Sequence, residues 1–263
     1  MRPSSRVALV IGGSVAVVTA GAAIAAGAVA LGRLRERRSA TSMREESRPA
    51  EASPATDAQF TLYAPGGRYG YLVNGPIGWV MARLMPIIEP GVYARVAETL
   101  DLQPDDELLD IGCGPGAFLA SKAKHVRRVV GLDLSNVMLR EAERRLADRI
   151  ADGTASLVLA SSATLPFDDG EFSAVSAIFA PASPREAFRV LRPGGRFVWS
   201  DPSPARTPSE STASAEAIAW GEADYRRMLE EAGFADIAVT VMNRWTLGDY
   251  LLASGRRPTT TRE

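Results

Sequence analysis

The 263-residue chain is poor in the side chains on which many enzymes and structural sites depend. Cys113 is its only cysteine and His125 its only histidine, so neither a disulfide framework nor a closed zinc site of the usual kind can form. A Ser-His-Asp triad would need His125 itself as its base. The formal net charge of −1 argues against a nucleic-acid partner, because phosphate-binding surfaces need a basic excess.

Residues 7–32 contain no charged side chain and are mostly Ala, Val, Ile, Leu and Gly. A helix of this length reaches roughly 39 Å, enough to cross the ~30 Å hydrocarbon core of a bilayer. Four arginines among residues 33–38 follow the apolar run, which favours a retained anchor at residues 1–38 over a cleaved signal peptide. The positive-inside rule then places the rest of the chain in the cytoplasm, whereas cleavage would give a secreted protein.

The chain after this anchor divides by composition into a linker and a globular part. Residues 39–58 are rich in Ser, Arg, Glu, Pro and Ala, which predicts a disordered linker. Residues 59–100 include apolar stretches broken by Pro86 and Pro90, and we interpret them as a helical cap, a lid or an interfacial helix. A folded domain at residues 101–257 and a disordered tail at 258–263 complete the expected organisation.

From residue 102 onward, short apolar runs alternate with amphipathic stretches, the pattern of a parallel sheet covered by helices on both faces. Strands are expected at residues 107–111, 128–133, 155–160, 172–179, 196–201, 236–242 and 248–253, with the last two forming an antiparallel edge hairpin. Helices are expected at residues 117–125, 135–151, 184–191 and 223–232. Gly233 is the expected stop of the last helix.

Three glycines follow the first expected strand: Gly112, Gly114 and Gly116. Their missing side chains allow a ligand to approach the backbone and the N–H groups that begin the next helix. Gly112, Gly114 and Ala117 also fit the dinucleotide fingerprint G-x-G-x-x-G/A, which leaves an NAD-dependent oxidoreductase open. A tight turn without a ligand is the other interpretation.

Asp133 ends the next expected strand. A carboxylate at this place can accept hydrogen bonds from the two vicinal hydroxyls of a ribose, as in nucleotide and S-adenosylmethionine sites. It can also cap the helix that begins near Ser135. The two roles are compatible, and the position at a strand end favours a ligand.

The segments LLDIGCGPG at residues 108–116 and VGLDLS at 130–135 resemble the first two motifs of class I S-adenosylmethionine-dependent methyltransferases, in particular the small-molecule, type 11-like branch. Similar blocks follow in the family's order: LPF at 165–167, FSAV at 172–175, RVLRPGGRF at 189–197 and LEEAGF at 229–234. The NAD-dependent reading does not account for these later blocks. The resemblance implies an α/β fold, with a Rossmann-like, seven-stranded, mostly parallel sheet and helices on both faces, here preceded by the transmembrane helix.

The resemblance also implies S-adenosyl-L-methionine as the cofactor, and no metal site is expected. It assigns the methionine part of the cofactor to Asp110 and Gly112, and the ribose to Asp133. Met138 either packs on the adenine or is an ordinary core residue. Where the family often has Asp, this chain has Ser161, which can still hydrogen-bond the adenine edge. The cofactor residues expected from the resemblance are Asp110, Gly112, Cys113, Gly114, Gly116, Asp133, Leu134, Met138, Ser161 and Ser162.

The methyl acceptor is less well marked. The end of the fourth strand, residues 178–181, has neither the Asn/Asp-Pro-Pro motif of the family's amide and base N-methyltransferases nor a histidine. The apolar anchor and cap favour a small-molecule acceptor, lipid-like or quinone-like. We interpret His125 as a surface residue, and no catalytic residue is assigned. The polar candidates near the substrate are Asp201, Tyr63, Tyr69 and Tyr71. An S-adenosylmethionine-binding domain without transferase activity is the alternative.

Overall fold

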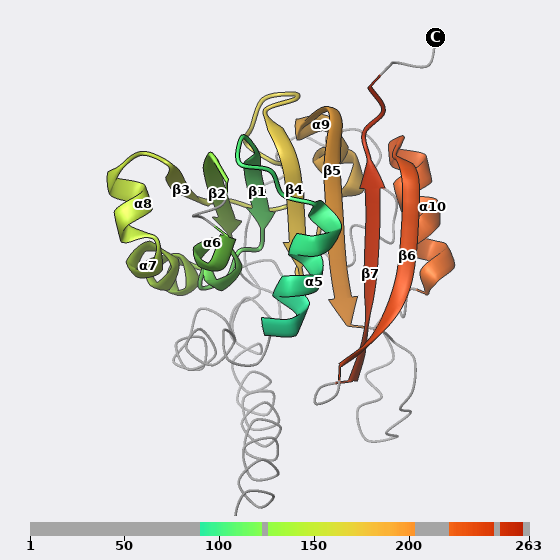
Figure 1. Ribbon diagram of the computed structural model, residues 1–263, viewed down its shortest axis with the longest axis horizontal. Helices are drawn as coiled ribbons and strands as arrows, with labels where there is room; N and C mark the ends of the chain where they lie inside the picture. Colours follow the sequence, from blue (N-terminus) through green and yellow to red (C-terminus); the bar gives the residue numbers. More distant parts are fainter. Residues whose placement is uncertain (1–89, 123–125, 203–220, 245–247, 260–263) are drawn as a thin grey trace, which may run out of the picture. The chain divides into compact units, whose positions relative to one another are not determined.

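A seven-stranded sheet runs through the part of the chain that the computed structural model describes, residues 90–122, 126–202, 221–244 and 248–259 (Figure 1). All of these residues belong to one compact unit, residues 52–263. In chain order the elements are α5 (Pro90–Leu100), β1 (Glu107–Ile111), α6 (Ala117–Lys122), β2 (Arg128–Asp133), α7 (Asn136–Arg145), α8 (Ala147–Ala151), β3 (Ala155–Leu159), β4 (Phe172–Ile178), α9 (Pro184–Val190), β5 (Leu191–Pro202), α10 (Glu222–Ala232), β6 (Ala235–Arg244) and β7 (Gly248–Arg256).

The strand order is β3-β2-β1-β4-β5-β7-β6, with parallel pairing from β3 through β5. β7 runs antiparallel to both β5 and β6, which confirms the predicted hairpin, and β6 forms the sheet edge. The direction of strand progression reverses between β1 and β4. Open α/β sheets bind ligands beyond the carboxyl ends of the strands at such a switch point, so this topology places the candidate site beside β1 and β4.

The sheet is buried on both faces, as expected for parallel strands that carry near-continuous apolar runs. Leu109 and Ile111 of β1 point into a core formed with α9 and α10. Leu108 points the opposite way, into a core with α5 and α6. In Figure 1, α5 crosses the face of the sheet over β4 and β5. This alternation also puts Asp110 on the α5 face.

α5 begins at Pro90, where the sequence predicts a break between apolar stretches. Proline fits the first turn of a helix because the first N–H groups have no intrahelical acceptor there. Val92, Val96 and Leu100 recur every four residues and are buried against the sheet. The last part of the predicted cap segment therefore covers the sheet as a helix.

Two further predictions differ in detail from the structure. The helix expected at residues 135–151 is divided into α7 and α8 at Leu146, whose φ and ψ are −106° and 12°. The fifth strand begins at Leu191 rather than at Arg196, because Leu191 pairs with Phe172. Gly233 does stop α10, with φ at 96°.

Several predictions concern residues outside the described ranges: the transmembrane helix at 7–32, the linker at 39–58, most of the cap and part of the tail. His125, Tyr63, Tyr69 and Tyr71 also lie outside them. Among the residues that are described, no helix is long and apolar enough to cross a membrane.

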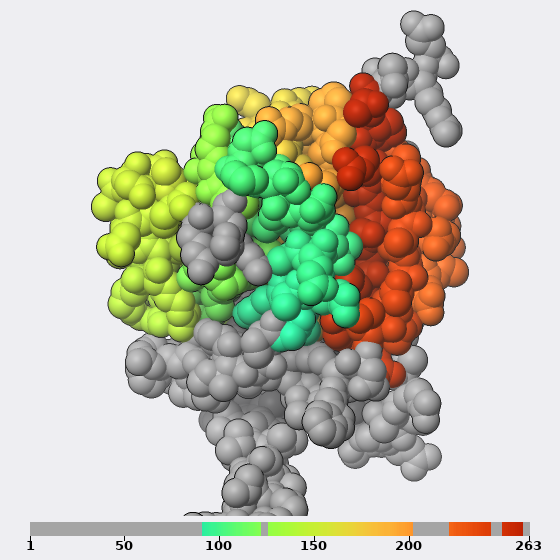
Figure 2. Space-filling view, in the orientation of Figure 1, coloured from blue at the N-terminus to red at the C-terminus, as the bar shows by residue number. Residues whose placement is uncertain are grey.

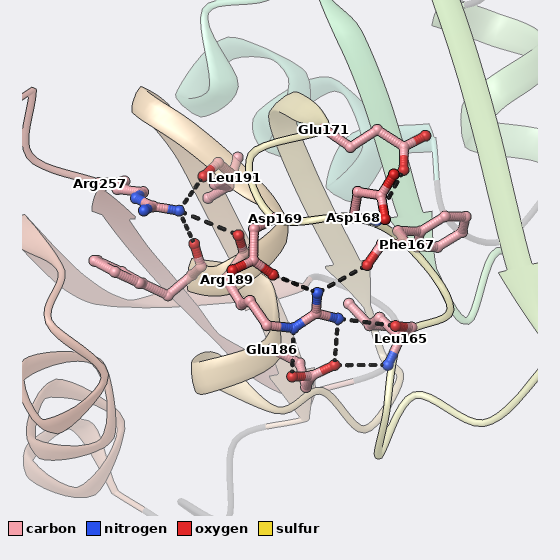
Figure 3. Close-up of polar contacts among 10 residues, drawn as sticks. Leu165, Phe167, Asp168, Asp169, Glu171, Glu186, Arg189, Leu191 and Arg257 are labelled. Atoms are coloured by element: carbon pink, nitrogen blue, oxygen red, sulfur yellow. Dashed lines mark hydrogen bonds and ion pairs between the residues drawn. The ribbon is translucent and has the colours of Figure 1, made fainter.

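Side chains from α9 fix the loop that leads into β4 (Figure 3). Arg189 donates hydrogen bonds to the carbonyl oxygens of Leu165 and Phe167 at 2.9 and 2.8 Å. It also pairs with Glu186, which accepts a bond from the Leu165 N–H at 2.7 Å. Arg257 donates to three carbonyls at the end of α9. Two of the family-like blocks, at 165–167 and 189–197, are thereby joined.

Arg189→Ala is expected to lower the free energy of unfolding by about 2 kcal/mol, because it removes several charge-assisted hydrogen bonds that are only partly exposed to solvent. Urea unfolding of the full-length chain measures the change. Arg185→Ala is the matched control, since Arg185 lies on the same helix and is exposed. Equal effects of the two substitutions would contradict a specific role for the Arg189 contacts.

Candidate functional site

The three glycines of the loop after β1 all adopt left-handed backbone conformations, with φ of 67° at Gly112, 52° at Gly114 and 73° at Gly116. The loop is also closely packed. A Cβ at Gly112 would lie 2.3 Å from the Cβ of Ala180, and a Cβ at Gly116 would lie 2.9 Å from the Cβ of Ala142. Gly112 and Gly116 are therefore required both by backbone conformation and by space, which makes this loop more than an ordinary tight turn.

Asp133 connects the end of β2 to the glycine loop. One carboxylate oxygen accepts the Gly114 N–H at 2.8 Å, and the other accepts the Ser135 N–H at 2.8 Å. The side chain of Ser135 itself caps α7, so Asp133 is not the N-cap that one reading of the sequence suggested. The Leu134 backbone N–H also contributes a hydrogen bond, and the remaining acceptor capacity of the carboxylate is available to a ligand hydroxyl. Burial raises the pKa of Asp133, and its backbone hydrogen bonds oppose that rise.

Asp110 lies on the neighbouring strand and is almost fully buried, with 2% of its surface exposed. It is directly opposite Ser176 of β4 across the switch point, and the Ser176 hydroxyl lies 2.7 Å from its carboxylate. Burial raises the pKa of Asp110 to about 7, the Ser176 hydrogen bond opposes this, and the charge of Asp133 adds to it. Within the described part of the chain neither carboxylate is in an ion pair.

The other residues assigned by the resemblance surround this loop to different degrees. The Cys113 thiol is buried against Gly131, and burial raises its pKa further, so it stays protonated. Met138 has 3% exposure on α7, which fits both a core role and an adenine contact. Leu134 is partly exposed beside Asp133.

The two serines after β3 differ from each other. Ser161 is exposed, and its hydroxyl accepts the Ala163 N–H at 3.2 Å. Ser162 is buried, with 6% exposure. The buried serine therefore lies next to the position that the resemblance selects for the adenine contact.

The turn after β4 carries no recognisable motif in the sequence, but its backbone conformation and its contacts with other strands constrain it. Phe179 has a φ of 51°, an uncommon value for a bulky residue. Its N–H donates to the Ser200 carbonyl at 2.9 Å, and its ring packs edge-on against Tyr250 with the centroids 5.9 Å apart. The indole N–H of Trp199 donates to the Ala180 carbonyl at 3.1 Å. No signal in the sequence could have shown these contacts, which depend on pairing between distant strands.

Comparison with known proteins identifies a methyltransferase domain in the chain. Residues 108–195 match the family described as "Methyltransferase domain". Over 118 residues the chain is 35% identical to a demethylmenaquinone methyltransferase of Symbiobacterium thermophilum, covering 41% of this chain and 47% of that protein. Over 180 residues it is 31% identical to 27-O-demethylrifamycin SV methyltransferase of Amycolatopsis mediterranei, covering 62% and 66% of the two chains.

The chain belongs to the class I S-adenosylmethionine-dependent methyltransferases. It spans about a third to two thirds of the lengths of the curated relatives that it matches. Its fold is like that of phosphoethanolamine N-methyltransferase 2 of Haemonchus contortus, solved with S-adenosyl-L-methionine, with a TM-score of 0.60, 15% identity, and 72% and 59% of the two chains covered. At that identity the likeness concerns the fold.

The residues fit the family's cofactor. S-adenosylmethionine carries a sulfonium and an ammonium group together with a ribose, and the loop is flanked by the buried Asp110 and the partly buried Asp133, neither of which forms an ion pair in the described ranges. A carboxylate without a cationic partner is costly to keep ionised where solvent is excluded, and a cationic ligand offsets that cost. No cluster of His, Cys, Asp and Glu that could hold a metal ion is found among the described residues.

Proposed function

We propose that this protein transfers the methyl group of S-adenosylmethionine to an apolar small molecule at a membrane surface. The observation that carries the proposal is the arrangement of Asp110 and Asp133 around a glycine loop in which neither Gly112 nor Gly116 has room for a side chain. Relatives named for demethylmenaquinone and for 27-O-demethylrifamycin support a small-molecule acceptor. The uncharged run at residues 7–32 supports a single-pass anchor, with the methyltransferase domain in the cytoplasm.

The reaction needs little covalent help from the protein. When bound, the cofactor supplies an electrophilic methyl group on a sulfonium, and the leaving group is a neutral thioether. Asp133 would accept the ribose hydroxyls through its remaining acceptor capacity, and Asp110 would balance the positive charge of the methionine part. The close packing of Gly112 against Ala180 would exclude water on the side of the site that faces β4. Proximity and orientation of the acceptor would then supply much of the rate.

Calorimetric titration of the full-length chain with S-adenosylmethionine tests the first part of this proposal. We expect Asp133→Ala to weaken binding by about 100-fold or more, because two hydrogen bonds to a charged acceptor are lost. Asp133→Asn is the matched control: the amide keeps one acceptor oxygen, so a smaller loss is expected. Unchanged affinity in both variants would refute the assignment of the cofactor site.

Incubation with radiolabelled S-adenosylmethionine and separate lipid and aqueous cell extracts tests the acceptor. Label is expected in the lipid extract and absent with Asp133→Ala. Label confined to the aqueous extract would refute an apolar acceptor. Tight cofactor binding with no transfer to either extract would favour a binding domain without transferase activity, the alternative that the exposed Ser161 suggests.

A further inference from the structure

A second pair of polar side chains lies at the carboxyl end of β5, outside the glycine loop at residues 112–116. The hydroxyl of Tyr225 donates a hydrogen bond to the Asp201 carboxylate at 2.5 Å. Asp201 is the eleventh of the twelve residues of β5, and Tyr225 lies in the first turn of α10, which begins at Glu222. Both residues therefore lie near the carboxyl ends of the parallel strands, where open α/β sheets bind their ligands.

A chain of direct contacts links this pair to the cofactor loop. The ring of Tyr225 packs on Trp199 with the centroids 4.6 Å apart. The Trp199 indole N–H donates to the carbonyl of Ala180 at 3.1 Å, and the Cβ of Ala180 fills the space above Gly112. The pair is thus fixed, through two residues, to the loop that holds the cofactor. Asp201 therefore lies near the carboxyl end of β5, as Asp110 and Asp133 lie at the carboxyl ends of β1 and β2, which run parallel to β5 in the same sheet.

The environment of Asp201 suits it to take up a proton. It is half-buried, and burial raises its pKa to about 6, while the Tyr225 hydrogen bond opposes that rise. A carboxylate with this pKa is ionised at neutral pH and is a stronger base than an exposed aspartate. Besides Tyr225, the charged or titratable side chains on the two elements beside it are Glu222, Asp224, Arg226, Arg227, Glu230 and Glu231 of α10 and Asp249, Tyr250 and Arg256 of β7.

We propose that Asp201 is the general base of the transfer reaction, that Tyr225 is its positioning residue, and that the acceptor carries a phenolic or enolic hydroxyl. This inference rests on the proposed function and names the acceptor class of the same site. The acceptor O–H bond breaks and its proton goes to a carboxylate oxygen of Asp201. The acceptor oxygen forms a bond to the methyl carbon as the carbon–sulfur bond breaks, with the electron pair going to sulfur. The proton then leaves to solvent.

The acidity of the acceptor follows from the strength of the base. The pKa of a phenol is near 10, about four units above the pKa of Asp201. This difference in pKa becomes smaller as the methyl group is transferred, because the oxygen that bonds to it becomes more acidic. An aliphatic alcohol is far less acidic, and a carboxylate is too weak a base for it. An aromatic amine attacks as the neutral molecule and loses its proton only after the methyl group has been transferred, so Asp201 would give it no advantage in that step. The pair therefore selects hydroxyls attached to unsaturated carbon.

The test uses 1-naphthol as the probe and 1-naphthylamine, which lacks the hydroxyl, as its matched control. Full-length wild-type chain and radiolabelled S-adenosylmethionine should label 1-naphthol in preference to the amine, with a rate that falls below about pH 6. Asp201→Asn should lower the rate by about 100-fold or more and leave the affinity for S-adenosylmethionine unchanged. Asp168→Asn, an exposed carboxylate before β4, should change the rate less than about twofold.

Tyr225→Phe separates a positioning role from a purely structural one. Loss of the hydroxyl removes the hydrogen bond that lowers the pKa of Asp201, so the acidic limb of the rate profile should move to higher pH. An unmoved limb, or an Asp201→Asn rate within about threefold of wild type, would overturn the inference. So would faster labelling of 1-naphthylamine, or failure to label 1-naphthol by a chain that binds the cofactor. Absence of cofactor binding would instead refute the proposed function itself, and the inference with it.

Discussion

Asp110→Asn is expected to stabilise the cofactor-free protein at pH 8 and to abolish measurable binding of S-adenosylmethionine. Burial raises the pKa of this carboxyl from 3.8 to about 7, so its ionised form destabilises the folded state. At about 1.4 kcal/mol per pKa unit, the upper limit of the gain is about 4 kcal/mol. The amide introduces N–H donors that find few acceptors in this site, so we expect a net gain on the order of 2 kcal/mol.

The pH dependence gives this prediction a definite sign. Between pH 4 and 7 the folded state holds a proton on Asp110 that the unfolded chain has lost, so wild-type stability rises as the pH falls through this range. The advantage of the asparagine variant should therefore shrink from pH 8 to pH 5. Urea unfolding at both pH values measures it, and calorimetry with S-adenosylmethionine measures the lost function.

Asp106→Asn is the matched control for Asp110→Asn. Asp106 is also a buried carboxylate, with 4% exposure, but it is paired with Arg196. Removing its charge leaves a cation without a partner, so this substitution should destabilise the protein. If both asparagine variants are destabilised to the same extent, Asp110 is an ordinary structural carboxylate and the argument for a cationic ligand fails.

Asp110 and Asp133 show which parts of the site can be predicted from the local sequence. Asp110, Gly112 and Asp133 each follow or end a short apolar strand, and the bounds of β1 and β2 agree with the expected 107–111 and 128–133. Such strands are fully buried, and their bounds are marked by abrupt changes from apolar to polar or glycine residues. The pattern therefore identified both the strands and the loop between them.

The contacts that complete the site are not local. Ser176 meets Asp110 because β4 pairs with β1 in a particular register, and Tyr225 meets Asp201 because α10 begins beside the end of β5. A periodicity of apolar residues predicts that a strand exists, but it does not fix the register with a distant strand. Asp201 was a candidate from its place at a strand end, whereas nothing marked Tyr225 as its partner.

The same distinction explains the turn after β4. Ala180 is an inconspicuous residue in the sequence, yet its carbonyl accepts the Trp199 indole N–H and its methyl group occupies the space that Gly112 leaves. The glycine loop is therefore shaped from two sides, by its own backbone conformation and by a residue about 70 positions later in the chain. The two contributions can be separated by substitution.

Gly112→Ala is expected to lower the free energy of unfolding by roughly 4 kcal/mol or more and to abolish cofactor binding. A left-handed conformation costs a non-glycine residue about 1–2 kcal/mol. The new methyl group would also lie 2.3 Å from the Cβ of Ala180, which forces the loop and the turn apart. Gly153→Ala measures the first cost alone, because Gly153 has a φ of 77° and no neighbouring atom within 4 Å of a Cβ.

A double variant then isolates the clash. Gly112→Ala with Ala180→Gly moves the methyl group from one side of the contact to the other, so the conformational cost remains while the overlap is relieved. Urea unfolding should show that the double variant recovers much of the stability lost in Gly112→Ala, with a favourable coupling energy on the order of 2 kcal/mol. Simple additivity of the two substitutions would mean that Ala180 does not shape the loop. The double variant could be stable and still fail to bind S-adenosylmethionine. That result would show that the cofactor needs a residue without a side chain at position 112, since relief of the clash with position 180 alone does not restore binding.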